Sequence, residues 1–65
     1  MKIKLNGKEY ETSKNITILD LIKEKNISKD QVVILKNGDI VFKEDLEMNL
    51  IENDELEILR FVSGG

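Results

Sequence analysis

Cysteine, histidine, proline and tryptophan are all missing from this sequence of 65 residues, and each absence excludes something. Without cysteine there is no disulfide, no thiolate nucleophile and no thiolate metal ligand, which suits a reducing compartment. Without histidine the chain lacks the usual acid–base group at neutral pH and the commonest metal ligand. We therefore expect a protein that is not an enzyme, has no catalytic residue of its own and binds no metal.

The length predicts a single domain over residues 1–65. A chain of this size buries roughly 60% of its unfolded surface, which is enough for a marginal but unaided fold. No apolar run approaches the roughly 20 residues that cross a bilayer. The alternating residues after Met1 do not resemble the apolar segment of a signal peptide. We expect a soluble, cytoplasmic protein.

Charge is abundant but nearly balanced, with 13 acidic and 10 basic residues and a net charge of −3. This mild acidity argues against a nucleic-acid-binding protein, which normally has a basic face. Such charged runs usually form a solvated surface, and the alternative is a docking face for a basic partner. The acidic residues concentrate late in the chain, at Asp39, Glu44, Asp45, Glu47, Glu52, Asp54, Glu55 and Glu57, and lysines early, at Lys2, Lys4, Lys8 and Lys14.

The first dozen residues predict a β-hairpin. Residues 1–5 alternate between apolar residues and lysine, as in a half-buried strand. Asn6-Gly7 follows, and this dipeptide accepts the positive φ angles of a tight hairpin turn. Residues 8–12 then return as a second strand, with Tyr10 directed inward.

A short helix is predicted next, from Thr17 to Asn26. Thr17 is a suitable N-cap and Asp20 a suitable capping-box acid. Asn26 suits the left-handed residue that ends a helix. The apolar stripe consists of Ile18, Leu21 and Ile22, so the helix needs a sheet against which to pack.

The remaining segments predict three more strands, which gives the order β-β-α-β-β-β. This order is typical of an α+β fold of the β-grasp (ubiquitin-like) type, a mixed sheet of four to five strands with one helix packed on one face. In that arrangement the first and last strands are parallel neighbours in the middle of the sheet. The predicted segments are strand 32–35, turn 37–38, strand 40–41, a loop or helical turn 43–49 with Leu46 as its anchor, turn 53–54 and strand 55–62.

These segments together resemble the ubiquitin-like sulfur carrier family, most closely its thiamine-biosynthesis branch, ThiS. The resemblance covers the whole chain, with one departure: the branch often has Val-Pro-Arg where this chain has Val41-Phe42-Lys43. The matching residues are Asn6-Gly7, the run Thr17 to Ile22, Asn37 to Val41, Asn53 to Ile58, and Phe61-Val62-Ser63-Gly64-Gly65.

The resemblance implies a carrier whose chemistry occurs at Gly65. A ThiF-like adenylyltransferase would use ATP to adenylate the Gly65 carboxylate, and sulfur would then form a thiocarboxylate. A ThiG-like thiazole synthase would receive the sulfur for thiamine biosynthesis. The chain itself would bind no cofactor.

The C-terminal segment has the composition of an insertable tail. Gly64 and Gly65 carry no Cβ, so they can enter a narrow active site. We expect residues 62–65, including Val62 and Ser63, to form a flexible tail.

Docking needs a surface as well as a tail. If Leu56 and Ile58 face the core, then Leu59 and Phe61 face outward. If Val32 and Ile34 point inward, Val33 and Leu35 lie beside them, which makes these four residues a candidate partner-binding patch. The alternative is that Leu59 and Phe61 only cover the sheet edge or a second small cluster.

Three alternatives remain open from the sequence. One is a sulfur carrier similar to the small subunit of molybdopterin synthase, and another is a ubiquitin-like modifier that links Gly65 to lysines. The third is a plain binding module, such as an RNA-binding β-grasp domain.

Overall fold

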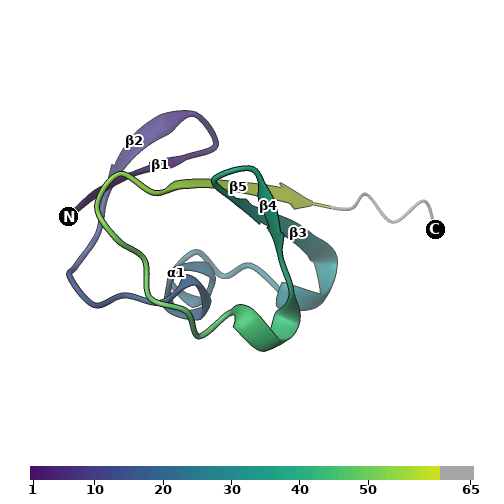
Figure 1. The fold of residues 1–65 in the computed structure, drawn as a ribbon. Helices are drawn as coiled ribbons and strands as arrows, with labels where there is room; N and C mark the ends of the chain where they lie inside the picture. Colours follow the sequence, from purple (N-terminus) through teal and green to yellow (C-terminus); the bar gives the residue numbers. More distant parts are fainter. Residues whose placement is uncertain (61–65) are drawn as a thin grey trace.

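A computed structural model describes residues 1–60 of the chain. A five-stranded sheet, in the order β2-β1-β5-β3-β4, carries one helix on one side (Figure 1). Two short 3₁₀ turns, η1 (Lys29–Gln31) and η2 (Lys43–Asp45), flank the β3–β4 hairpin. The other elements are β1 (Lys2–Leu5), β2 (Lys8–Glu11), α1 (Ile18–Glu24), β3 (Val32–Lys36), β4 (Asp39–Val41) and β5 (Glu55–Arg60).

The first and last strands of the described chain lie side by side in the sheet. β1 pairs with β5 in parallel, with Lys4 opposite Glu55 and Leu5 opposite Leu56. β5 then pairs with β3 in antiparallel fashion, so β5 occupies the centre of the sheet. The prediction of a mixed β-grasp sheet with one helix on one face is therefore confirmed.

Both Asn-Gly pairs form the predicted tight turns. Asn6 and Gly7 have φ angles of 51° and 83°, and Asn37 and Gly38 have 52° and 91°. Two successive positive φ values define the type I′ turn, whose twist matches that of the hairpin strands. Asparagine and glycine tolerate these angles better than other residues do.

Hydrogen bonds from neighbouring residues cap both ends of α1. The Asp20 amide donates to Thr17 Oγ1 at 3.0 Å, and the Thr17 amide donates to Asp20 Oδ2 at 3.1 Å, so the predicted capping box is present. At the other end Asn26 has a φ of 55°, and the Ile27 amide donates to the Ile22 carbonyl at 2.9 Å. This is a Schellman end. The helix ends at Glu24 and its C-cap is Lys25, one residue before the predicted cap Asn26, which has the predicted left-handed conformation.

The core lies between the sheet and α1 and includes the segment before β5. Leu46, the predicted anchor of the loop, is buried, and its carbonyl accepts from the Leu19 amide at 2.8 Å. Tyr10 packs inward against the core as predicted. The buried apolar residues are Ile3, Ile16, Ile18, Leu21, Ile22, Ile34, Leu46, Leu50, Leu56 and Ile58.

Candidate docking face

Residues of β5 alternate between the core and the outer face of the sheet. Leu56 and Ile58 are 1% and 8% exposed, whereas Leu59 is 50% exposed. Because successive side chains on a strand point to opposite faces, Leu59 lies on the face away from α1. The predicted division of this strand into a core side and an outer side is correct for Leu56, Ile58 and Leu59.

Two predicted patch residues of β3 share this outer face. Val33 lies opposite Leu59 in the sheet, and Leu35 lies opposite Glu57. Ile34, between them, is buried in the core. The structure therefore brings Val33, Leu35 and Leu59 together on adjacent strands.

Sequence reasoning missed two neighbours of these residues. Ile40 of β4 lies directly opposite Leu35 and is 58% exposed, and Phe42, just after β4, is 59% exposed. Phe42 keeps an extended backbone, which places it on the same side as Ile40. We call Val33, Leu35, Ile40, Phe42 and Leu59 the outer apolar patch.

The other half of the outer face is charged. On β1 and β2, Lys2 lies opposite Glu11 and Lys4 opposite Glu9. Opposite charges in facing positions stabilise an antiparallel strand pair. The face is therefore apolar over β3 and β4 and ionic over β1 and β2, with Glu57 of β5 beside the apolar part.

Asparagine side chains from both turns hold the central strand. Asn6 Oδ1 accepts from the Ile58 amide at 2.7 Å, and Asn6 Nδ2 donates to the Ile58 carbonyl at 3.4 Å. Asn37 Oδ1 accepts from the Glu55 amide at 2.9 Å. The sequence indicated turns at Asn6 and Asn37 but not these bonds to β5.

Asp54 corrects the prediction that the late acidic residues form a solvated surface. Its side chain is 3% exposed. Its carboxylate accepts from Asn37 Nδ2 at 3.1 Å and from the Ile51 amide at 2.9 Å. Burial of a carboxylate requires such donors, because an unpaired polar group in the interior is costly.

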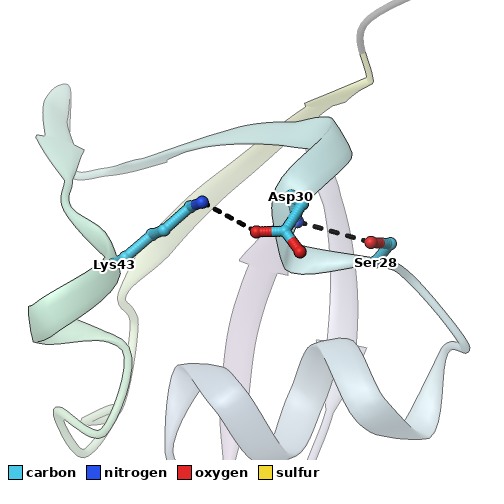
Figure 2. Close-up of polar contacts among 3 residues, drawn as sticks. All are labelled: Ser28, Asp30 and Lys43. Carbon is cyan, nitrogen blue, oxygen red and sulfur yellow. Dashed lines mark hydrogen bonds and ion pairs between the residues drawn. The ribbon is translucent and has the colours of Figure 1, made fainter.

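An ion pair joins the two 3₁₀ turns at the base of the β3–β4 hairpin. Lys43 Nζ lies 2.7 Å from Asp30 Oδ1, and Ser28 Oγ accepts from the Asp30 amide at 3.4 Å (Figure 2). The hydrogen bond from Lys43, and then its positive charge, lower the pKa of the Asp30 carboxyl from its ordinary value. The pair is exposed, so its contribution to stability is small.

The remaining predicted site residues are Phe61, Val62, Ser63, Gly64 and Gly65, which lie outside the described residues. Within residues 1–60 the structure has no helix with the length and hydrophobicity to cross a bilayer. The same part of the chain contains no group of three or more side chains suited to holding a metal ion.

The fold places the chain in the ubiquitin-like β-grasp class. Its computed structure is similar to the crystal structure of the thiamine biosynthesis protein ThiS from Geobacter metallireducens, with a TM-score of 0.83, 22% identity and full coverage of both chains. The solution structure of a thiamine biosynthesis protein from the same organism gives a TM-score of 0.79 at 22% identity, covering all of this chain and 88% of that one.

Sequence comparison identifies the family. The model of the ThiS family matches residues 3–65. The sulfur carrier protein ThiS of Bacillus subtilis (strain 168) is 35% identical, and the match covers 97% of this chain and 98% of that protein. The chain belongs to the ThiS family.

Proposed function

We propose that this protein is a cytoplasmic sulfur carrier for thiamine biosynthesis and that Gly65 is its point of covalent attachment. The observation that carries the proposal is the 35% identity, over almost the entire length of both chains, to a sulfur carrier protein. The protein acts as a carrier and a co-substrate, and the catalytic groups belong to its partner enzymes.

The chemistry of the terminus explains why a partner is needed. An α-carboxyl group has a pKa of roughly 3.3–3.7, so it is ionised at neutral pH and is a poor electrophile. In the proposed first step a carboxylate oxygen of Gly65 attacks the α-phosphate of ATP and pyrophosphate leaves. The terminal sulfur of a persulfide-type donor then attacks the carbonyl carbon and displaces AMP, which gives an acyl disulfide between Gly65 and the donor. A second thiol then attacks the donor-side sulfur, forms a disulfide with the donor and releases the thiocarboxylate. ATP is thus used by the adenylyltransferase and not held by the carrier.

The proposed docking surface is the outer face of the sheet. Val33, Leu35 and Leu59 lie together there. Phe61, the fourth residue of the predicted patch, lies outside the described residues. An exposed apolar patch beside charged residues is typical of a protein-binding surface. In this proposal the patch binds the adenylyltransferase, while Val62, Ser63 and Gly64 carry Gly65 into its active site. The thiazole synthase is the proposed acceptor of the sulfur.

Two related functions share the adenylation step with the proposed thiamine sulfur carrier. A molybdopterin-type carrier and a protein modifier also begin from an acyl adenylate at the terminal glycine. They differ in what displaces AMP and in the final acceptor. The identity to a ThiS protein favours the thiamine route.

The decisive experiment combines the chain with the cognate adenylyltransferase, ATP and a sulfur donor. Intact-mass measurement should show a gain equal to the replacement of one oxygen atom by one sulfur atom. The matched control is the chain that lacks Gly65, which should fold equally well and gain no sulfur. The thiocarboxylate proposal fails if the complete chain forms an adenylate yet never acquires sulfur.

A further inference from the structure

The two outermost strands of the sheet differ in how they are protected. In the described chain β2 and β4 lie at the edges of the sheet. The exposed side chains of β2 include Lys8, Glu9 and Glu11, and charge of this kind discourages pairing with another strand. β4 has one exposed charge, Asp39, but Ile40 and, just after the strand, Phe42 are exposed apolar residues that provide no such protection.

The hairpin register also directs main-chain groups of β4 outward. Lys36 and Asp39 flank the two-residue turn, so they form a hydrogen-bonded pair. The next pair, Leu35 and Ile40, is then a non-hydrogen-bonded pair. The N–H and C=O of Ile40 consequently point away from β3, toward the open edge of the sheet.

We propose that β4 binds an extended segment of the adenylating partner, which adds to the sheet as a further strand next to Ile40. This inference rests on the proposed function and specifies the geometry of its docking step. Strand addition uses main-chain hydrogen bonds for affinity and alternate side chains for specificity. Ile40 contributes to both, because its side chain belongs to the outer apolar patch and its main chain lies at the edge.

Charge identifies the chemistry of the added segment. Asp39, Glu44 and Asp45 are exposed along and beside β4. The only lysine between residues 39 and 45 is Lys43, and its Nζ already pairs with Asp30 Oδ1 at 2.7 Å. A segment with basic residues between apolar ones complements this edge, whereas a second copy of the chain would bring three more carboxylates to it.

Chemical synthesis of this short chain allows a test of one N–H at a time. Nα-methylation of Ile40 removes the outward donor of β4, and Nα-methylation of Glu9 removes the corresponding donor of β2, since Glu9 lies opposite Lys4 in a non-hydrogen-bonded pair. We expect the first change to raise the Kd for the cognate adenylyltransferase about tenfold, which corresponds to about 1.4 kcal/mol. Methylation of Glu9 should leave this Kd unaltered. Thermal unfolding followed by circular dichroism checks that both methylated chains are folded.

A second measurement needs no modified chain. Amide hydrogen exchange of Ile40 in the native sequence should slow on addition of the adenylyltransferase, while exchange of Glu9 should not. Phe42→Ser should also weaken binding, whereas Ile51→Ser, at a residue 65% exposed on the connection before β5, should not.

Each outcome decides something. Adenylation of Gly65 with no slowing at Ile40, or with equal effects of the two methylated chains, overturns strand addition and leaves the proposed function standing. Sedimentation that shows self-association through Ile40 replaces the basic segment with a second copy and also overturns it. Failure of the enzyme to adenylate the native chain removes the proposed function and the β4 inference together.

Discussion

Asn37 in the β3–β4 turn donates its side-chain amide to the buried carboxylate of Asp54, with Nδ2 and Oδ1 3.1 Å apart. Asp54 stands immediately before β5, so this bond joins the tip of one hairpin to the start of the central strand. Asn37 also accepts from the Glu55 amide through Oδ1, and its own amide donates to the Glu55 carbonyl at 2.7 Å. One asparagine thus shapes the turn and fixes where β5 begins.

Asn37→Asp should destabilise the fold even though aspartate tolerates the positive φ of this position. The change replaces a donor with an acceptor that faces the carboxylate of Asp54. We expect a loss of about 1–3 kcal/mol in the free energy of unfolding at neutral pH, measured in urea. The double variant Asn37→Asp with Asp54→Asn restores a donor–acceptor pair and should recover part of that loss. A double variant no more stable than the single one would show that the effect does not come from this pair.

Asn6 should matter for the middle of β5 in a comparable way. Asn6→Gly keeps the turn conformation but removes both side-chain bonds to Ile58. We expect a loss of about 1 kcal/mol and faster hydrogen exchange at the Ile58 amide. Asn15→Gly is the matched control, because Asn15 also has a positive φ, of 61°, and lies in the connection between β2 and α1, away from β5 in the sequence. Equal losses in the two variants would contradict the role of the Asn6 amide.

The capping box predicts a pH dependence. The pKa of Asp20 is lowered, chiefly by the hydrogen bond from the Thr17 amide and then by that from its hydroxyl. Because the folded pKa lies below the unfolded value, the stabilisation by Asp20 is present above the unfolded pKa. It is lost as the pH falls from the ordinary aspartate pKa of 3.8 through the lower folded pKa. An NMR titration of Asp20 should give a pKa below the ordinary range, partly restored toward it by Thr17→Ala.

Lys43→Met should raise the pKa of Asp30 toward its ordinary value and change stability little. The lysine lowers that pKa through a hydrogen bond and its charge, yet both groups are exposed. Added salt should weaken the shift in the native protein, because ions screen exposed charges. An Asp30 titration that does not differ between the native chain and the variant would contradict the ion pair in solution.

Leu59→Ser should separate folding from docking. Leu59 is half-exposed on the outer face, so its replacement should leave thermal unfolding nearly unchanged. If the outer apolar patch binds the adenylyltransferase, the KM for the carrier should rise by about tenfold with little change in kcat, a loss of about 1.4 kcal/mol. Ile51→Ser serves as the control for an exposed apolar residue outside the patch. Identical kinetics for native and Leu59→Ser chains would exclude the patch from docking.

The sequence predicted features that depend on neighbouring residues. Asn-Gly turns, the Thr17–Asp20 capping box and the alternation in β5 are all local, and each is present in the structure. The bond between Asn6 and Ile58 joins residues 52 positions apart, so it becomes visible only when β1 and β5 are known to be parallel neighbours.

In the candidate site, too, features set by neighbouring residues were predicted and features that depend on strand pairing were missed. Leu59 and Val33 were placed on the outer face from strand alternation, and that placement is correct. Ile40 was missed because β4 has only three residues, too few for a clear alternating pattern. Its orientation follows from the pairing of Leu35 with Ile40 across the turn.

The central position of β5 also governs when the protein can fold during synthesis. β5 is synthesised after both hairpins, yet both β1 and β3 pair with it. Until residues 55–60 emerge, the two hairpins have no common strand between them and the core cannot close. A nascent chain that has not reached residue 60 therefore cannot form this sheet, and any folded copy of the protein already has a completed β5.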